Sequence, residues 1–519
     1  MYRPGKITYR DGWVTGNHLG WYHRCAGGSY VNCLMTEPEP RATLRTESLV
    51  ARLLVTAARR RQERLKEAAV LSKEDNEILT RVSPGTPMGN LLRRYWIPAC
   101  LSSEIEDPDG SPARVRLLGE DLVAFRDTDG RVGLIGEFCP HRGASLFYGR
   151  NEECGLRCAY HGWKFDVTGQ CVDQRSELHP FAHRIKTTSY PVHESGGIIW
   201  AYLGPAETMT PFRDFGTDSL PAGEVAAAKE IVHCNWVQSM DGDVDTAHIS
   251  NLHQFDAIDD VPDDGTDKPG YPSGYMSMRF WRHDPRALIE VQDEWHGFRY
   301  AGIRQTPNGY RHARITAYIF PASNIIAQIP FSTRQIFVVP ADDTLTHRYN
   351  FNTQPPANPR DLGGPPFFTY EKYPYEMMPR NGIIHRTYTR DNDYRIDRIS
   401  QKGTTYTGIM DFRSQDAMAT ESAGPVYDRS LEHLGSTDVA VIRMHRHLLR
   451  AARSLAEGSE PPALGGSGDF RRIRSAEKIL ADGEDWRVLG TDDDPIVQEA
   501  LLARQGRPAP EAGSGSRPA

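Results

Sequence analysis

Apolar positions along the chain follow a strand-like pattern first and a mixed pattern afterwards. From about residue 113 to residue 204, apolar residues come in short runs separated by turn residues, which is typical of strands. The clearest case is a predicted hairpin, in which the apolar runs 122–126 and 131–135 flank the turn sequence Asp127-Thr-Asp-Gly130. Strands followed by mixed helices and strands predict an α+β protein.

Beyond residue 205 the pattern combines helical and strand periods. Helices are predicted over about 235–252, 424–433 and 438–456, and strands around 287–293, 298–304, 312–320 and 324–330. Nearer the N-terminus, Ser72-Lys-Glu-Asp75 resembles a capped helix start and predicts a helix to about Val82. Residues 41–70 carry leucines and arginines at helical spacing, which predicts an amphipathic helix with a basic face.

The length and the net charge of the chain exclude some classes of protein. The chain has 519 residues, of which 39% are hydrophobic and 25% charged, and this length predicts two or more domains. The net charge of −7 argues against nucleic acid as a partner. Residues 1–66 nevertheless hold 12 Lys and Arg against 5 Asp and Glu, so the acidity lies in the rest of the chain.

The sequence shows no signal for export or for a membrane. No apolar stretch reaches the roughly 18 to 20 residues that a membrane helix requires, and the N-terminus lacks the apolar core of a signal peptide. Eight cysteines without an export signal indicate a reducing compartment. We therefore expect a cytoplasmic protein that uses its cysteines as ligands or in packing.

Two short Cys/His pairs form the first candidate metal site. They are Cys139-Pro-His141-Arg-Gly and Cys158-Ala-Tyr-His161-Gly-Trp. Two thiolates and two imidazoles suit either a tetrahedral zinc ion or a [2Fe–2S] cluster of Rieske type. Zinc fingers usually pair Cys with Cys and His with His, whereas a Rieske centre takes one Cys and one His from each of two tight loops. The spacing therefore favours the [2Fe–2S] cluster.

A second candidate site is the D-x-x-H-x4-H pattern of Asp245, His248 and His253. On an ideal helix the two histidines lie about 140° apart, so convergence on one metal requires a kink, a bulge or a helix end between them. Two histidines and one carboxylate would form the facial triad of non-heme Fe(II) oxygenases. The spacing does not choose the carboxylate. The candidates are Asp411, Asp416, Glu421 and Asp428.

Together the two motifs resemble the oxygenase component of the Rieske non-heme iron oxygenases, in particular its phthalate dioxygenase-type branch. The family pattern QDxxxxES…GPxxDRSxEHLG matches residues 415–435. The resemblance implies that Asp416 completes the iron site with His248 and His253, and that Asp245 bridges His248 and a cluster histidine. It also implies an antiparallel β domain that carries the cluster, followed by a catalytic helix-grip domain with a curved antiparallel sheet.

The resemblance covers nearly the whole chain except its ends and suggests domain boundaries. The expected parts are a poorly matched basic extension (1–70), a helix plus the Rieske domain (71–205), the catalytic domain (206–457) and a C-terminal segment (458–519). The last segment becomes rich in Pro, Gly and Ser, and we expect disorder from about residue 504. Because family members begin near Leu71, we expect the extension to be an upstream mis-start or dispensable, with Val70 at the position of an initiator.

The resemblance also implies cofactors and partners. These are a Rieske [2Fe–2S] cluster, a mononuclear non-heme Fe(II), an NADH-dependent flavin and iron–sulfur reductase, O2, an aromatic substrate, and a head-to-tail homotrimer or stacked trimers. The same iron centre performs dihydroxylation, monohydroxylation or oxidative O- or N-demethylation. Ile249 stands where we expect the phthalate enzymes to carry a small hydroxyl residue, which leaves other aromatic acids, aryl ethers and N-alkyl compounds open.

Substrate contacts are less defined by the sequence. Aromatic residues on or beside predicted strands belong either to the core, which is the more common case for such positions, or to an aromatic pocket: Trp295, Phe298, Tyr300, Tyr318 and Phe320. Arg299, Arg304 and Arg314 lie among them, and a carboxylated substrate would favour an arginine clamp. Two other classes stay open at this point, a zinc-binding scaffold and a Rieske electron carrier without chemistry of its own. The long chain after Pro205 argues against the carrier.

Overall fold

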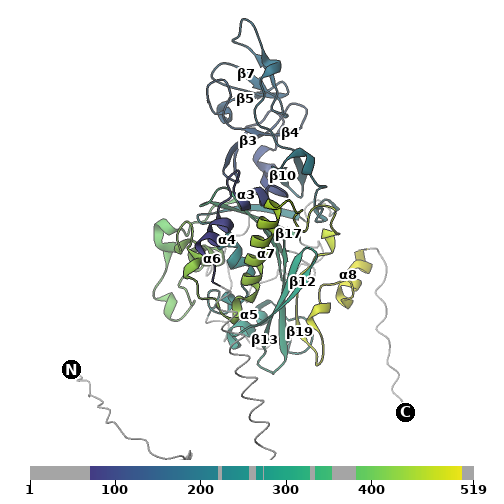
Figure 1. Cartoon of the computed structure of the whole chain (residues 1–519). Coiled ribbons are helices and arrows are strands. Elements are labelled where there is room, and N and C mark those ends of the chain that lie inside the picture. The colour runs from purple at the N-terminus through teal and green to yellow at the C-terminus, as the bar shows by residue number, and fades with distance from the viewer. Residues whose placement is uncertain are drawn as a thin grey trace, which may run out of the picture. The chain divides into compact units, whose positions relative to one another are not determined.

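The computed structural model describes residues 70–219, 225–255, 265–272, 274–327, 334–353 and 382–504 (Figure 1). The basic helix predicted over 41–70 lies outside the described residues except for Val70, and so does the disorder expected past Arg504. The described residues combine helices with four sheets that are almost entirely antiparallel, which confirms the predicted α+β class.

Two short capped helices precede the first strand. Helix α2 (Lys73–Thr80) begins after Ser72, whose side chain accepts a backbone hydrogen bond from the first turn at 3.0 Å, so the predicted helix start is confirmed. Helix α3 (Pro87–Leu92) follows a break at Gly85, where a φ of +86° suits glycine. Both helices pack on helix α7 (Val439–Ala456), which belongs to the second half of the chain.

Three small antiparallel sheets follow, with strand orders β1-β10-β9, β2-β3-β4 and β5-β6-β7-β8. Their strands are β1 (Trp96–Leu101), β2 (Ala113–Leu117), β3 (Glu120–Arg126), β4 (Val132–Gly136), β5 (Arg150–Glu152), β6 (Gly155–Arg157), β7 (Trp163–Phe165), β8 (Cys171–Gln174), β9 (Val192–Ser195) and β10 (Ile198–Tyr202). Strands β3 and β4 are the predicted hairpin. Phe125 pairs there with Gly133, and a Cβ on Gly133 would lie 2.7 Å from the Phe125 ring, so the pair requires glycine.

The second half of the chain is built on one large sheet of order β12-β13-β14-β15-β16-β17-β11-β18. Its strands are β11 (Val225–Val232), β12 (Leu288–Glu294), β13 (Gly297–Gln305), β14 (Arg311–Ile319), β15 (Ser323–Ile326), β16 (Arg334–Pro340), β17 (Thr346–Thr353), β18 (Gly382–Ile384) and β19 (Ala476–Leu480). Strand β14 pairs with β15 through its last residues and with β19 through its first, so the chain beyond residue 457 also joins this sheet. Helix α7 packs on β12 of the sheet (Figure 1).

The helices of this half differ from the prediction in three places. The helix predicted over 235–252 is α4 (Trp236–Val244), which ends before both histidines. The helix predicted over 424–433 is wrong, because only a 3-10 turn forms at Arg429–Leu431 after Gly424 with its φ of +95°. Helix α6 (Phe412–Ser422) was not predicted. The remaining helices are α5 (Gly274–His283) and α8 (Pro495–Arg504), and α7 confirms the prediction for 438–456.

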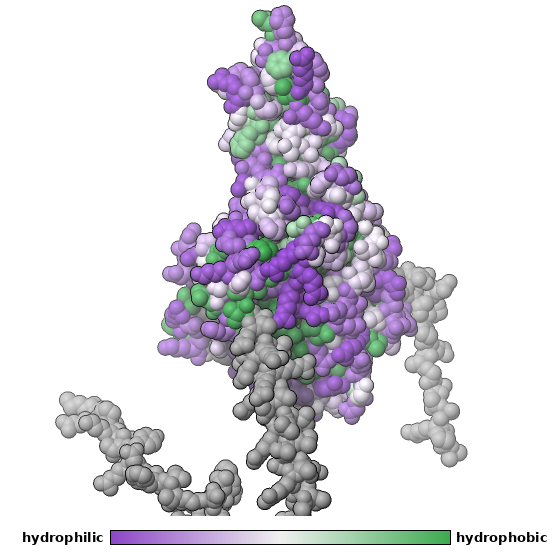
Figure 2. All heavy atoms as spheres, in the orientation of Figure 1, coloured by the Kyte–Doolittle hydropathy of each residue, from purple (hydrophilic) through white to green (hydrophobic). Residues whose placement is uncertain are grey.

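Hydrophilic residues cover most of the coloured face in Figure 2, and apolar residues are scattered among them. Within the described part of the chain, no helix combines the length and the apolar character needed to cross a membrane.

Candidate metal centres and active site

The two Cys/His motifs form twin loops between short strands. In the first loop the Gly143 N–H donates to the Cys139 carbonyl at 2.8 Å, and in the second the Gly162 N–H donates to the Cys158 carbonyl at 3.0 Å. Both glycines have a positive φ, +73° and +72°, which L side chains rarely adopt. The sequence motif thus produces the same tight turn twice, each with one cysteine and one histidine.

The candidate ligands of the two loops approach each other in pairs, and the thiol of Cys139 lies beside that of Cys158. The sulfur-bearing residues Cys139 and Cys158 are buried, and the rings of His141 and His161 lie 4.4 Å apart between centroids. His141 stacks on Trp163 at 4.4 Å with an interplanar angle of 6°. The Nδ1 atom of His141 is buried and has no hydrogen-bond partner among the described residues. Two buried thiols, two adjacent imidazoles and an orphaned ring nitrogen fit a Rieske [2Fe–2S] cluster.

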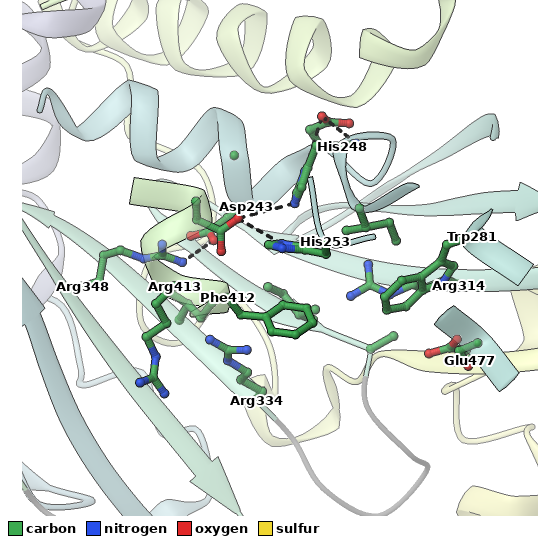
Figure 3. A pocket seen from close by; sticks show the side chains of 18 of the residues that line it. Asp243, His248, His253, Trp281, Arg314, Arg334, Arg348, Phe412, Arg413 and Glu477 are labelled. Atoms are coloured by element: carbon green, nitrogen blue, oxygen red, sulfur yellow. Dashed lines mark hydrogen bonds and ion pairs between the residues drawn. The ribbon is translucent and has the colours of Figure 1, made fainter. Parts of the chain in front are cut away.

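His248 and His253 converge on a second point with Asp416 of helix α6. Figure 3 shows the two histidines side by side there. The Nε2 atoms of His253 and His248 lie 3.0 Å and 3.8 Å from Asp416 Oδ1. One potential ligand atom from each residue lies within 4.8 Å of the other two. Two imidazoles and one carboxylate at this spacing fit one mononuclear iron.

The other acidic candidates for the third ligand have structural partners. Asp411 caps α6 by accepting from the Ser414 N–H at 2.7 Å. Glu421 forms a buried ion pair with Arg386, and Asp428 accepts from the backbone and side chain of Ser430. The geometry therefore brings only Asp416, of the four candidates, to the two histidines.

The end of helix α4 explains how both histidines reach this point. Asp245 has extended backbone angles, and its carboxylate accepts from the N–H groups of Ala247 at 2.6 Å and His248 at 3.2 Å. Such local hydrogen bonds compete with helix continuation. His248 then lies on a 3-10 turn and His253 in the following loop, so the two rings are no longer separated by the helical 140°. The helix end lies before both histidines, not between them as expected.

Electrostatics couple the three side chains. Burial disfavours the ionised form of Asp416, yet the adjacent His253 and His248 hold the pKa of this carboxyl well below its usual range. Burial lowers the pKa of His248, but the Asp245 carboxylate outweighs burial and the net shift is upward. Because metal ligation requires a neutral imidazole, metal binding and the protonation of His248 would compete.

The three acidic residues near the end of α4 have different partners. Asp241 forms an ion pair with Arg429 at 2.7 Å and contacts His445. Asp243 forms an ion pair with Arg348. Asp245 alone of the three faces a ring nitrogen of His248, with its Oδ2 atom 3.4 Å from Nδ1.

A cavity of about 320 Å³ opens beside the two histidines and Asp416 (Figure 3). Its apolar lining includes Ile249, Trp281 and Phe412. Its charged lining, besides the acidic residues already described, consists of Arg314, Arg334, Arg348, Arg413 and Glu477. The lining thus combines apolar and aromatic side chains with many charged ones, and its four arginines could bind a small organic anion.

Most residues predicted for the substrate pocket lie elsewhere. Phe298, Tyr300, Tyr318 and Phe320 are buried in the core, and Trp295 packs on Phe470, so none of these five candidates lines the cavity. Arg299 donates to the backbone of Leu489 and Arg304 to that of Thr246. Of the three candidate arginines only Arg314 lines the cavity. Trp281, Phe412 and Glu477 were missed, because no local pattern distinguishes them from core or surface residues.

Family models match two successive parts of the chain. The Rieske [2Fe-2S] domain model matches residues 95–188, and the model described as LigXa C-terminal domain like matches residues 201–505. The phthalate 4,5-dioxygenase oxygenase subunit of Pseudomonas putida is 36% identical over 450 residues, which cover 83% of this chain and 98% of that protein. This chain belongs to the Rieske non-heme iron oxygenases. It is an oxygenase subunit of the phthalate dioxygenase type.

Two further relatives of this Rieske oxygenase have similar coverage. The 3-chlorobenzoate-3,4-dioxygenase oxygenase subunit of Comamonas testosteroni is 36% identical over 80% of this chain and 96% of its own. The 5,5'-dehydrodivanillate O-demethylase oxygenase subunit of a Sphingobium species is 32% identical over 76% of this chain and 84% of its own. The predicted family is confirmed. A second matched domain after residue 201 separates this Rieske oxygenase from a single-domain electron carrier.

Proposed function

We propose that this oxygenase takes NADH-derived electrons from a flavin and iron–sulfur reductase and uses O2 to hydroxylate a carboxylated aromatic substrate. Cys139, His141, Cys158 and His161 would hold the [2Fe–2S] cluster, and His248, His253 and Asp416 the iron. The observation that carries the proposal is the convergence of these last three residues at the cavity, with Nε2 of His253 3.0 Å from Asp416 Oδ1. Because the electrons come from NADH, the proposal places the enzyme in the cytoplasm.

The charge of the cavity supports a carboxylated substrate. The Arg314 guanidinium lies 5.7 Å from the Trp281 ring, and its Nε atom is buried without a hydrogen-bond partner among the described residues. A buried arginine with an unused donor favours a carboxylate, and the aromatic faces of Trp281 and Phe412 suit an aromatic ring. The names of the relatives, phthalate, chlorobenzoate and dehydrodivanillate enzymes, agree with this substrate class.

The chain's own residues prepare the site for this chemistry. When bound, the cluster supplies single electrons and the iron supplies the place where O2 is reduced. Asp245 holds the Nδ1 side of His248, which turns the Nε2 atom toward Asp416. Ile249 and Phe412 border the cavity and keep water from the reacting ring, while Arg314 orients the substrate through its carboxylate.

Electron delivery requires a second copy of the chain in this proposal. In a head-to-tail homotrimer the cluster of one subunit would lie near the iron site of the next subunit. Asp245 and His248 would belong to the subunit with this iron site, and Asp245 would bridge His248 and a cluster histidine of the first subunit. The placement of Asp245 against His248, and not of Asp241 or Asp243, supports this role. A carboxylate between two imidazoles also provides a short hydrogen-bonded path.

A substrate screen tests the proposed function. The cluster- and iron-loaded enzyme is incubated with NADH, a surrogate reductase, O2 and a panel of aromatic acids, matched esters and aryl methyl ethers, and products are identified by mass spectrometry. We expect hydroxylated aromatic acids, with NADH consumption that depends on the acid. Formaldehyde release from methyl ethers, without ring hydroxylation, would contradict the proposed hydroxylation and show that the enzyme is an oxidative demethylase. Oxidation of esters in preference to acids would contradict the carboxylate site.

A further inference from the structure

A buried glutamine lies next to one of the proposed iron ligands. Gln415 is fully buried on helix α6, and its Oε1 atom lies 2.7 Å from Nδ1 of His253. Its amide Nε2 donates to the backbone carbonyl of Ile409 at 2.6 Å. Ile409 is itself fully buried, so the amide is held from both sides.

These two contacts determine which nitrogen of the neutral His253 ring carries the proton. Because the Ile409 carbonyl can only accept, the NH2 group of Gln415 must point toward it, and Oε1 must point toward His253. An amide oxygen can only accept as well, so Nδ1 of His253 carries the proton and donates it to Gln415. In the neutral ring that binds a metal, the lone pair then lies on the other ring nitrogen, Nε2, which is 3.0 Å from Asp416 Oδ1.

One face of helix α6 supplies three contacts to this ring. Phe412, Gln415 and Asp416 are spaced i, i+3 and i+4, so they lie on the same side of the helix. The Phe412 ring lies 4.8 Å from the His253 ring at an interplanar angle of 34°, and Gln415 holds the Nδ1 edge. Asp416 stands at the opposite edge of the ring.

The two histidines therefore have chemically different partners. Nδ1 of His248 faces the carboxylate of Asp245, whereas Nδ1 of His253 faces a neutral amide. A carboxylate would raise the basicity of the ring and add a negative charge to the site, and an amide fixes the ring without adding charge.

We propose that Gln415 is a positioning residue, which holds His253 as the Nδ1-protonated tautomer with Nε2 directed at the metal. The proposal rests on the proposed function in one respect, namely that His253 binds the iron. Partners of this kind typically change metal affinity by about 10- to 100-fold when removed.

Metal binding by the full-length chain tests this role. The protein is prepared with its [2Fe–2S] cluster intact and its mononuclear iron removed, and is titrated with Co(II), whose d–d absorption reports ligation. We expect Gln415→Leu, which is similar in volume but cannot accept a hydrogen bond, to bind Co(II) about 10- to 100-fold more weakly than wild type. Gln415→Glu keeps an acceptor for Nδ1, and we expect it to bind more tightly than Gln415→Leu.

Gln335→Leu is the matched control. Gln335 is also a buried glutamine, and it donates to Ser323 Oγ at 3.1 Å in the sheet. We expect its Co(II) affinity to equal that of wild type. Should Gln415→Leu fail to fold, Gln415→Asn takes its place, because it keeps an amide but withdraws the oxygen from His253, and it is expected to weaken binding in the same way.

Two outcomes would overturn the proposal. One is a Co(II) affinity of Gln415→Leu within twofold of Gln335→Leu, and the other is an equal loss in Gln415→Leu and Gln415→Glu, which would show a purely steric effect. A failure of the proposed iron site looks different. In that case wild type itself does not bind Co(II), or His253→Ala binds it as well as wild type does.

Discussion

Arg314 and Glu477 are direct cross-strand neighbours, because β14 and β19 pair in a register that places them opposite each other. Both side chains line the cavity beside the proposed iron ligands (Figure 3). Glu477 also bonds to His312 at 2.8 Å. Burial by itself would raise the pKa of Glu477, but His312 and Arg314 outweigh burial, and the pKa is lowered. A strand from near the C-terminus thus adds a negative charge beside the arginine proposed to hold the substrate.

Replacing Arg314 tests its proposed contact with the substrate. Charge-assisted hydrogen bonds contribute about 1.5–3 kcal/mol, so we expect Arg314→Leu to raise KM for an aromatic carboxylate by about 10- to 100-fold. The amide of the same acid is a neutral control, and its KM is expected to change little. An equal rise in KM for the acid and the amide would contradict the contact.

Replacing Glu477 is expected to act in the opposite direction. In Glu477→Gln a negative charge next to the substrate carboxylate is removed while the side-chain shape is kept. Because the substrate carboxylate is then repelled less, we expect its KM to be about 3- to 10-fold lower than in wild type, which corresponds to about 1 kcal/mol of binding free energy. Steady-state kinetics at fixed ionic strength measure this, and a raised KM would show that Glu477 serves mainly to hold Arg314.

The bridging role of Asp245 predicts a selective loss of electron transfer. In Asp245→Asn we expect normal cluster and iron content but turnover reduced at least about 100-fold, because the charged link between the histidines is lost. Single-turnover experiments with a prereduced cluster follow cluster reoxidation directly. Asp243→Asn is the matched control, because Asp243 forms an ion pair with Arg348 and does not contact His248 in this way. We expect this variant to have a lower Tm but to reoxidise its cluster as wild type does. Full coupled activity of a metal-replete Asp245→Asn enzyme would refute the bridge.

The ion pair of Arg429 and Asp241 predicts a large effect on stability. Arg429 is fully buried and donates to Asp241 Oδ2 from Nη2 at 2.7 Å and from Nε at 3.2 Å. Arg429→Met leaves the carboxylate without this partner, and we expect the free energy of unfolding to fall by about 3–5 kcal/mol. The double variant Arg429→Met/Asp241→Asn should recover part of the loss. Urea unfolding of the single and double variants measures the effect.

Glu432 predicts how stability changes with pH. Burial, followed by the charge of Asp241, raises its pKa from 4.5 to about 7. Between these values the folded protein retains a proton that the unfolded chain releases, so the contribution of Glu432 to stability falls as pH rises from about 4.5 to 7 and is constant above. Glu432→Gln has no such penalty. We expect its Tm relative to wild type to rise from pH 5 to about pH 7, as the penalty for ionising the buried Glu432 builds up in wild type, and to stay constant up to pH 8. A difference in Tm that does not change with pH would contradict the shift.

Sequence reasoning predicted those features whose causes are local. The hairpin of β3 and β4, the capped start of α2 and the helix at 438–456 all follow from residues within a few positions of one another. The twin cluster loops belong to the same group, since Cys139 to Gly143 and Cys158 to Gly162 close on themselves through single hydrogen bonds. Asp416 was implied only through the resemblance of residues 415–435 to a family pattern.

Features that depend on distant parts of the chain were missed or wrong. The aromatic residues of β13 and β14 alternate like any half-buried strand, and the pattern does not say which face meets the cavity and which meets the core. Helix α6 was missed although it carries Asp416. The helix predicted through His248 ends at Val244, because the Asp245 carboxylate accepts from the N–H groups of Ala247 and His248.

The sequence by itself determined the family, the ligand types and the two short motifs, because cysteine, histidine and carboxylate side chains at fixed spacing limit the chemistry directly. Only the tertiary structure decided which acid meets the histidines, and that Gln415 holds His253 across 162 positions of the chain. It also decided that Arg314 lies beside Glu477 in the cavity wall. The physical reason is that these contacts depend on helix ends and strand register, which arise from packing over the whole sheet and leave no periodic trace in the sequence.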